Sequence, residues 1–311
     1  MTDPDIVTPV ALQRTNEATC TLPWYVQNSE YPPALATYQP LVNGEETFKA
    51  VHLAIEKATK TVDIICWGFQ PSMYFIRDGK NQVCIGDLLR AKAREGVRVR
   101  VLGWEMPLNL AGFAGEANLP GKGNVRFKDR ELQHSTPKQY ALDRKWFADC
   151  AVADDKALLQ ATHNLPVFVS RGFSWAERAE IAKQVKSNSL DPLISTRMHQ
   201  TLKLSATHHQ KSVLVDYECV DTAVGFVMGH NMLDEYWDSD AHSALNRKEG
   251  SKPAPNAGPR GDTPRQDISS QISGPILEHL HHNFASAWLK ETGEDLLHLR
   301  QANQVGPQLQ C

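Results

Sequence analysis

The amino-acid sequence predicts an α/β fold, because helical and strand-like apolar patterns alternate along it. From residue 46 to residue 60 apolar residues recur at roughly helical spacing, and TVDIICWGF then reads as a strand. The same order returns in CIGDLLRAKAREG, which ends at Gly96 where a C-cap glycine belongs, and in VRVRVLGW, which alternates with period two. A helix followed by a strand, twice in succession, predicts neighbouring parallel strands in a layered α/β domain.

Two further patterns extend this layer in the second half of the chain. The runs KSVLVD and TAVGFVM are joined by a short polar link, which is typical of a pair of strands. In SGPILEHLHHNFASAWLKETG, apolar residues recur every fourth position from Ile276 to Trp288, Pro275 lies in the first turn, and Gly293 follows the last turn. We expect this segment to be a helix that docks on the core.

The domain organisation follows from these patterns and from the segments between them. We expect a tail over residues 1–40, a single domain over 41–296, and a second tail over 297–311. Within the domain, residues 106–198 are interpreted as an insertion, a surface elaboration that includes a helix capped by Ser174. Residues 243–266 are rich in Pro, Gly and Lys and are expected to form a mobile, solvated loop.

Composition limits the classes of function. With 311 residues, of which 41% are hydrophobic, the chain can bury a sizeable core. The net charge of -3 gives no overall attraction to nucleic acid or to an anionic membrane, so any anion site must be local. The six cysteines form no C-x-x-C pair and are expected to be reduced thiols. The sequence contains neither a signal-peptide pattern nor an apolar run of the length of a spanning helix.

The stretch HHQKSVLVD carries the most informative polar residues. In a strand His209 and Lys211 project from the same face, because side chains repeat with period two. Asp216 has the opposite parity, so we expect it to orient or support the site rather than touch the ligand. An ammonium group neutralises phosphoryl oxygens and a neutral imidazole can attack phosphorus, so the pair suits a phosphate ester.

These residues resemble the phospholipase D superfamily. The spacing His209-x-Lys211-x-x-x-x-Asp216 is similar to its H-x-K-x-x-x-x-D motif, GFVMGHNMLDEYWD is similar to its second signature, and PRQDISSQISGPILEHLHHNFASAWLKE to the segment that follows. The resemblance covers most of the chain outside the N-terminal tail and the insertion. Its nearest form is the N-terminal half of bacterial phospholipase D-type effectors delivered by type VI secretion. The chain departs from the family in having Met228-Gly229 where many members have Gly-Gly or Gly-Ser, and in having a single motif.

The resemblance implies a phospholipase D-type sandwich with a mixed central sheet, of which this chain is one catalytic half. It implies that His209 is the nucleophile of a phosphohistidine intermediate, that Lys211 and Asn231 bind phosphoryl oxygens, and that Asp216 completes the catalytic motif. The reaction would cleave the distal phosphodiester bond of a glycerophospholipid at a membrane surface, without metal or cofactor.

The turn after the second strand is expected to complete the phosphate site. Gly229 would supply the turn and an exposed backbone N–H, and His230 would approach the phosphate. The alternative for His230 is a solvent-facing loop histidine. His208 is expected to be a neighbour of the site, and Trp67 and Trp104 to pack at its rim rather than to contact lipid. A metal site at His279, His281 and His282 is not expected, because adjacent helical positions do not share a face.

The single motif leaves the partners of the chain open. A second histidine would come from a homodimer mate or from a missing C-terminal segment, and the resemblance further implies a secretion apparatus and an immunity protein. We expect synthesis in the bacterial cytoplasm, with export to the periplasm of a target cell. We also expect the motif to lie at an apolar strand edge that the second half covers. Two alternatives remain, a dimeric nuclease-type phosphodiesterase and a catalytically incomplete phosphate-binding protein; the acidic balance disfavours nucleic acid.

Overall fold

The computed structural model describes residues 30–106, 111–112, 117–124, 126, 128–152, 164–188, 195–198, 201 and 206–311. By the contacts between its residues the chain divides into Met1–Pro33, of which only residues 30–33 are described, and Ala34–Cys311. The fold described below is that of Ala34–Cys311.

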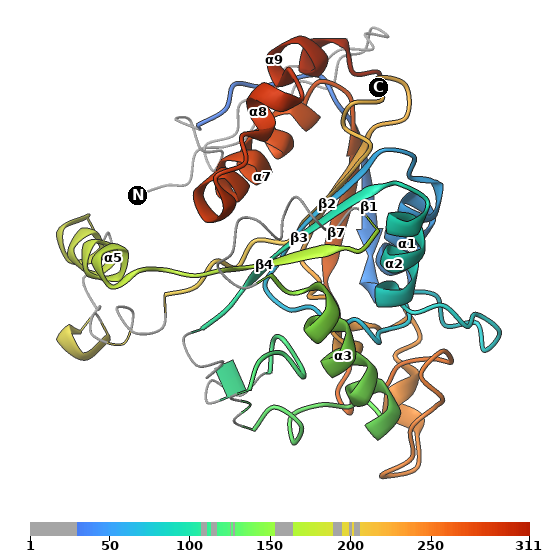
Figure 1. Ribbon diagram of the computed structural model, residues 1–311. Coiled ribbons are helices and arrows are strands. Elements are labelled where there is room, and N and C mark those ends of the chain that lie inside the picture. Colours follow the sequence, from blue (N-terminus) through green and yellow to red (C-terminus); the bar gives the residue numbers. More distant parts are fainter. Residues whose placement is uncertain are drawn as a thin grey trace, which may run out of the picture. The chain divides into compact units, whose positions relative to one another are not determined.

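A seven-stranded mixed sheet forms the centre of this unit, in the order β1-β7-β6-β5-β2-β3-β4 (Figure 1). Neighbouring strands β2, β3 and β4 are parallel, whereas β5, β6, β7 and β1 join by antiparallel pairing. The bounds are β1 (Thr37–Val42), β2 (Thr61–Cys66), β3 (Arg98–Trp104), β4 (Val167–Arg171), β5 (Ser212–Val215), β6 (Val224–Met228) and β7 (Ile268–Ser273). The predicted α/β class with a mixed sheet is therefore confirmed.

Helices cover both faces of the sheet. In Figure 1, α1 and α2 lie on one side of the sheet and α7, α8 and α9 on the other. The helices are α1 (Asn43–Lys57), α2 (Ile85–Arg94), α3 (Pro137–Cys150), α5 (Trp175–Asn188), α7 (Leu277–Thr292), α8 (Leu296–Leu299) and α9 (Ala302–Val305), with short 3₁₀ turns η2 (Asp234–Tyr236), η3 (Ser243–Asn246) and η4 (Gly306–Gln308). The main core joins α1 to the sheet through Phe48, Val51 and Ile55, and a second core forms where Phe284 and Trp288 of α7 pack on Ile65 and Leu102.

The predicted helix ends are confirmed at two glycines. Gly96 follows α2 with φ of 93°, and Gly293 follows α7 with φ of 79°, both in the left-handed region that a side chain disfavours. The first stop returns the chain to the sheet at β3, and the second leads into the short helix α8.

Two parts of residues 106–198 belong to the core, which corrects their interpretation as a surface insertion, whereas α5 is the predicted helix with Ser174 as its cap. Helix α3 contributes Trp146 and Phe147 to the main core, and β4 extends the sheet beyond β3, with Phe168 fully buried. Three aromatic side chains therefore anchor a segment whose polar and charged residues suggested a decoration.

Two other segments pack more closely than expected. Residues 297–311 form the end of α8, α9 and η4 rather than a tail, with Ala302 and Leu309 buried and the Tyr217 hydroxyl donating to the Ala302 carbonyl at 3.1 Å. In the loop 243–266, Arg260 is buried and its guanidinium donates to the carbonyl of His134. Side chains that could have been solvated instead tie both segments to the fold.

The strand that carries the motif is not an edge strand. β5 pairs with β2 on one side and with β6 on the other, so both of its hydrogen-bonding edges are occupied. The expectation of an open apolar edge at the motif is therefore wrong. The outer strands of the sheet are β1 and β4.

Candidate active site

The site lies at the end of the sheet where β5 begins and where β2 and β3 end. Ser212 of β5 pairs with Ile65 of β2, so the residues that precede β5 lie next to those that follow Cys66. Lys211 is held by the strand ladder, because its carbonyl accepts a hydrogen bond from Met228 N–H at 2.9 Å. The backbone of β5 and β6 thus fixes the position from which the Lys211 side chain extends.

The structure brings His209 and Lys211 together. The Lys211 ammonium lies 3.3 Å from each ring nitrogen of His209 and donates to the His209 carbonyl at 3.2 Å. Lys211 is buried, whereas His209 is exposed. Trp67 packs its indole edge-on to the imidazole, with ring centroids 5.4 Å apart. The imidazole therefore faces solvent while a buried ammonium group lies beside it.

The charges around His209 favour its neutral form. Burial lowers the pKa of His209, and the Lys211 ammonium lowers it further, while the Asp267 carboxylate opposes both effects. A histidine whose pKa lies below the usual value is unprotonated at neutral pH. That form has the free lone pair that nucleophilic attack requires.

Gly229 is required by close packing rather than by an exposed donor. Its N–H donates to the Ile268 carbonyl at 3.1 Å, which corrects the expectation that this N–H is free. A Cβ built at Gly229 would overlap the carboxylate of Asp267 and the Ile268 carbonyl. The turn after β6 folds back against the start of β7, and only a residue without a side chain fits there.

His230 is buried, so the solvent-facing alternative is wrong. It is 1% exposed, its Nδ1 lies 2.8 Å from the Ser269 hydroxyl, and its ring meets Phe48 edge-on at 5.7 Å. Burial lowers the pKa of His230 to about 4, with Asp267 opposing and Lys211 adding to the shift. Since Lys211 and Asp267 influence both His209 and His230, these four side chains gather at one place.

Asn231 offers an unused polar atom beside this group. The residue is 1% exposed, and its Oδ1 is buried without a hydrogen-bond partner among the described residues. Its carbonyl accepts from Leu233 N–H at 2.9 Å, which holds the turn. The unsatisfied atom is an acceptor and would need a donor from a ligand, so the phosphoryl oxygens assigned to Asn231 would have to be bound by its Nδ2 amide group.

Asp267 is the residue that sequence reasoning did not assign. It precedes β7, its Oδ1 accepts from Ile268 N–H at 2.8 Å, and its carbonyl accepts from Asn43 N–H at 2.9 Å. Its carboxylate is the negative charge that acts on His209 and His230. The segment PRQDISS, noted for its resemblance, contained the signal, but its proximity to the motif depends on how β7 pairs with β6.

Asp216 lies at the opposite end of β5 from His209. Its carboxylate accepts four hydrogen bonds, from Thr59 N–H, the Thr59 hydroxyl, Lys60 N–H and Thr61 N–H, at 2.7 to 2.9 Å. Its φ of 52° turns the chain sharply after the strand. Asp216 is thus a positioning residue that fastens the start of β2 to the end of β5.

The remaining sequence candidates support the site or lie away from it. Trp67 and Trp104 are buried and stacked at 5.9 Å, and the Asn118 amide donates to both of their carbonyls. His208 stacks on Phe173 at 3.9 Å.

His281 is buried against Tyr217, and among the described residues no group of three His, Cys, Asp or Glu side chains is placed to hold a metal ion. None of the helices in the described part of the chain has the length and apolar character needed to cross a membrane.

Comparisons with known proteins relate the chain to phospholipase D, although the matched family segment does not include the site residues. The family model described as Phospholipase D matches residues 54–122. Phospholipase D gamma 2 of Arabidopsis thaliana is 26% identical over 251 residues, which are 76% of this chain and 24% of that protein. Phospholipase D alpha 1 of Ricinus communis is 26% identical over 308 residues, which are 90% of this chain and 32% of that protein. The chain thus spans about a quarter to a third of the length of these relatives.

Two solved structures match most of this chain at low sequence identity. A phospholipase D family member, Nuc from Salmonella typhimurium, is 11% identical with a TM-score of 0.35, and the match covers 82% of this chain and 95% of that chain. Phosphatidylserine synthase of Haemophilus influenzae is 10% identical with a TM-score of 0.34, over 83% of this chain and 40% of that chain. Scores at this level support no argument about the present site.

Proposed function

We propose that this chain, which contains a phospholipase D superfamily domain, is the catalytic half of a phosphodiesterase that cleaves the distal phosphodiester bond of glycerophospholipids. One observation carries the proposal: a buried Lys211 ammonium lies 3.3 Å from both ring nitrogens of the solvent-facing His209. A nucleophile and a phosphate-binding cation thereby face the same space.

The proposed chemistry has two displacements at phosphorus. The neutral imidazole of His209 attacks phosphorus, the bond to the headgroup oxygen breaks, and a phosphohistidine forms while an acid protonates the leaving alcohol. Water then attacks phosphorus, the P–N bond breaks, and a phosphate monoester and free His209 result. Lys211 and the Asn231 amide hold the phosphoryl oxygens through both steps. No step requires a metal ion.

The acid that protonates the leaving alcohol has to come from outside this motif, since the sequence contains a single H-x-K-x-x-x-x-D. Such an acid contributes typically 10² to 10⁴ in rate.

The apolar side chains of Val42, Val227 and Ile268 are 40%, 48% and 55% exposed. The strand register places them on one face of the sheet, at the end where Asp267 and Gly229 lie. We propose that a second catalytic half covers this face.

The relatives favour a missing segment over a second copy of the chain as the source of that half. This chain spans about a quarter to a third of the length of the plant enzymes that it matches. We therefore propose that it is the first part of a longer two-motif enzyme. That the enzyme is an antibacterial effector, made in the bacterial cytoplasm and delivered by a secretion apparatus, is part of the same proposal; accumulation in the culture medium of secreting cells would test it.

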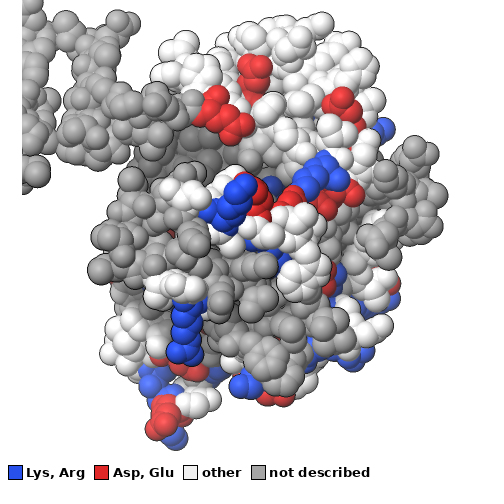
Figure 2. Space-filling view, turned by 90° about the vertical axis from the view of Figure 1, so that its left-hand side faces the viewer, with Lys and Arg blue, Asp and Glu red and all other residues white. Residues whose placement is uncertain are grey.

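A nuclease-type phosphodiesterase is the second candidate for the same chemistry. Its backbone-binding groove would gather cations. On the face that Figure 2 shows, the described Lys and Arg side chains are interspersed with Asp and Glu, in keeping with the net charge of -3. The described part of this face therefore gives no support to a basic groove for a nucleic-acid backbone.

The test is hydrolysis of phosphatidylethanolamine vesicles by the chain, alone and with a fragment that carries the second motif of a longer relative. We expect little activity from the chain alone, restoration by the fragment, and acid-labile phosphate on His209. His209→Asn should abolish both turnover and labelling, whereas His298→Asn, which alters an exposed histidine of α8, should leave both unchanged. Turnover of His209→Asn equal to that of the parent would refute the assignment, and cleavage of DNA in preference to lipid would replace the substrate class.

A further inference from the structure

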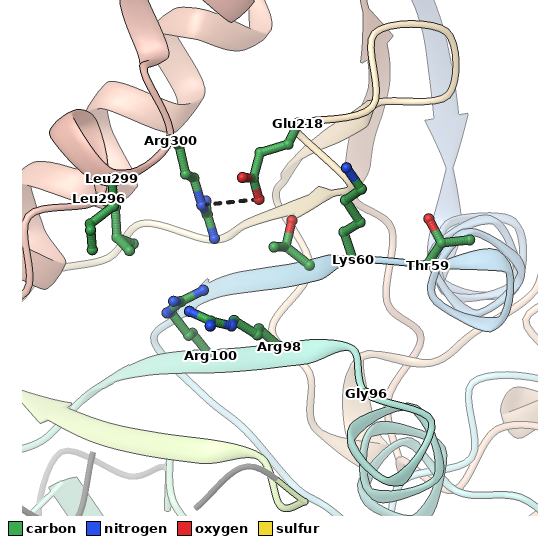
Figure 3. A pocket seen from close by; sticks show the side chains of 10 residues that line it. Thr59, Lys60, Gly96, Arg98, Arg100, Glu218, Leu296, Leu299 and Arg300 are labelled. Carbon is green, nitrogen blue, oxygen red and sulfur yellow. Dashed lines mark ion pairs between the residues drawn. The ribbon is translucent and has the colours of Figure 1, made fainter. Parts of the chain in front are cut away.

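A polar cavity lies at the end of the sheet opposite to the proposed catalytic site. It has a volume of about 500 Å³ and is lined from β2, β3, α8 and the loop after β5. Figure 3 shows Arg98 and Arg100 extending side by side from β3 toward Arg300, with Lys60 at the start of β2. Thr61 opens β2 and Trp67 follows its end, so the full length of this strand separates the cavity from His209.

Two buried polar atoms at this cavity have no hydrogen-bond partner in the part of the chain that the structure describes. They are Oγ1 of Thr61, a residue 2% exposed, and Nη1 of Arg100, a residue 6% exposed. Arg100 Nη1 does lie 3.6 Å from Asp63 Oδ1, an ion-pair distance outside hydrogen-bond range. Buried polar atoms are usually satisfied, but each of these two has less than 1 Å² of accessible surface, so a ligand in the cavity reaches them only after the side chains turn outward.

The charges at the cavity leave cations unmatched. Asp63 accepts two hydrogen bonds from Arg300, Glu294 accepts one from Arg100, and Glu218 lies 3.7 Å from Arg300. These three carboxylates therefore compensate the two buried arginines. Lys60 and Arg98 also line the cavity and are exposed, and neither forms an ion pair with a carboxylate in the described ranges.

We propose that this cavity binds a phosphate monoester. A phosphate monoester carries between one and two negative charges at neutral pH and offers three acceptor oxygens. Lys60 and the planar fork of Arg98 supply exposed donors, and arginine suits phosphate geometry in particular; Arg100 Nη1 and the Thr61 hydroxyl add donors when their side chains turn toward the ligand. The apolar side chains of Leu296 and Leu299 form one side of the cavity and would contact the esterified group.

The segment that carries the binding residues Lys60 and Thr61 is held in place by Asp216. Asp216 accepts hydrogen bonds from the N–H groups of Thr59, Lys60 and Thr61. A phosphate would therefore enter a site whose backbone is already ordered, so binding should cost little ordering entropy. The proposal does not depend on the activity of His209, because no residue is shared between the two sites.

Titration calorimetry with inorganic phosphate tests the site. Arg98→Gln and Lys60→Gln should each weaken binding about tenfold or more, as expected for the loss of a charged hydrogen-bond donor. Arg94→Gln and Lys49→Gln remove equal charges from exposed helix positions outside the cavity and should bind as the parent does. A loss of binding in Lys211→Gln would show that phosphate is held at the catalytic site. If Lys211→Gln does not fold, His209→Asn serves for the same comparison.

The source of the phosphate group is distinguished by two ligands. If soluble glycerol phosphate competes with inorganic phosphate, the ligand is a free phosphate ester. If the protein floats with phosphatidylcholine vesicles only when these contain phosphatidic acid, the ligand is a lipid headgroup. Either result supports the site if Arg98→Gln abolishes it. Absence of phosphate binding at millimolar concentration, equal binding by the cavity variants and the parent, or binding lost only in Lys211→Gln would overturn the proposal.

Discussion

Replacing Asp216 by asparagine should destabilise the fold without removing a group that touches substrate. The carboxylate Oδ1 accepts from Lys60 and Thr61, and Oδ2 accepts from Thr59 through its N–H and its hydroxyl. An asparagine keeps the size of the side chain and tolerates the φ of 52°. However, it retains one acceptor oxygen and turns an amide NH₂ toward donors.

The size of the effect follows from the bonds that are lost. A hydrogen bond to a charged group contributes about 1.5 to 3 kcal/mol, and two of the four cannot form in the variant. The hydroxyl of Thr59 can rotate and accept from the new NH₂, which recovers part of the loss. We therefore expect the free energy of unfolding to fall by about 3 kcal/mol, a large part of the roughly 5 to 15 kcal/mol of a typical domain. Asp216→Ala should cost more, since alanine in the left-handed region adds about 1 kcal/mol.

Urea unfolding followed by circular dichroism measures this change. The control is Asp221→Asn, an exposed aspartate in the same loop, which should unfold as the parent does. Below the unfolding transition, phosphodiesterase activity of Asp216→Asn, measured with the complementing fragment, should stay within a few-fold of the parent. A variant as stable as the parent would refute the positioning role, and one that is fully folded but inactive would show that Asp216 acts in the chemistry.

Three other predictions follow from the site and its surroundings. Burial lowers the pKa of His281 to about 3, so near pH 6.5 the unfolded chain takes up a proton that the folded chain does not. The stability that the neutral His281 contributes is therefore complete above pH 6.5 and falls toward pH 3, and by linkage the loss at pH 5 is about 2 kcal/mol. Thermal melts of His281→Phe at pH 7 and pH 5 should lack this part of the pH dependence. Activity restored by the second half should survive EDTA, since charge stabilisation is assigned to Lys211; loss in EDTA with recovery on adding Zn²⁺ or Mg²⁺ would contradict this. Val227→Lys should prevent association with the second half in sedimentation experiments, whereas Leu245→Lys, at another exposed apolar position, should not; equal association by both variants would place the contact elsewhere.

Elements with a continuous pattern were predictable from the sequence. The helix of residues 85–94 and the strand of residues 98–104 follow directly from apolar spacing and from Gly96. The alternation in the strand did not reveal that Arg100 is buried, because its partner Asp63 comes from β2 and its partner Glu294 from the link between α7 and α8. The core role of α3 and β4 was missed because Trp146 and Phe168 are separated by polar residues and become neighbours only when packed.

The candidate site shows the same division between local and tertiary information. Period-two spacing predicted that His209 and Lys211 share a face, and the structure brings them together although both precede β5. Asp216 points elsewhere as predicted, but it follows β5 in a turn with φ of 52° rather than lying in an unbroken strand. The burial of His230 and the proximity of Asp267 depend on the pairing of β6 with β7, which no short-range pattern encodes. Residues joined through a hairpin or strand were therefore predictable, and those brought in by a distant strand were not.

The central place of β5 also determines how the protein fails when it is heated. Both edges of the strand are bonded, to β2 and to β6, so the amides of Val213 and Val215 can exchange with solvent only when neighbouring strands separate. Fraying of the outer strands β1 and β4 leaves this region closed. Inactivation of the His209–Lys211 pair should therefore coincide with cooperative unfolding of the whole sheet, and the catalytic strand should be among the last segments to exchange deuterium.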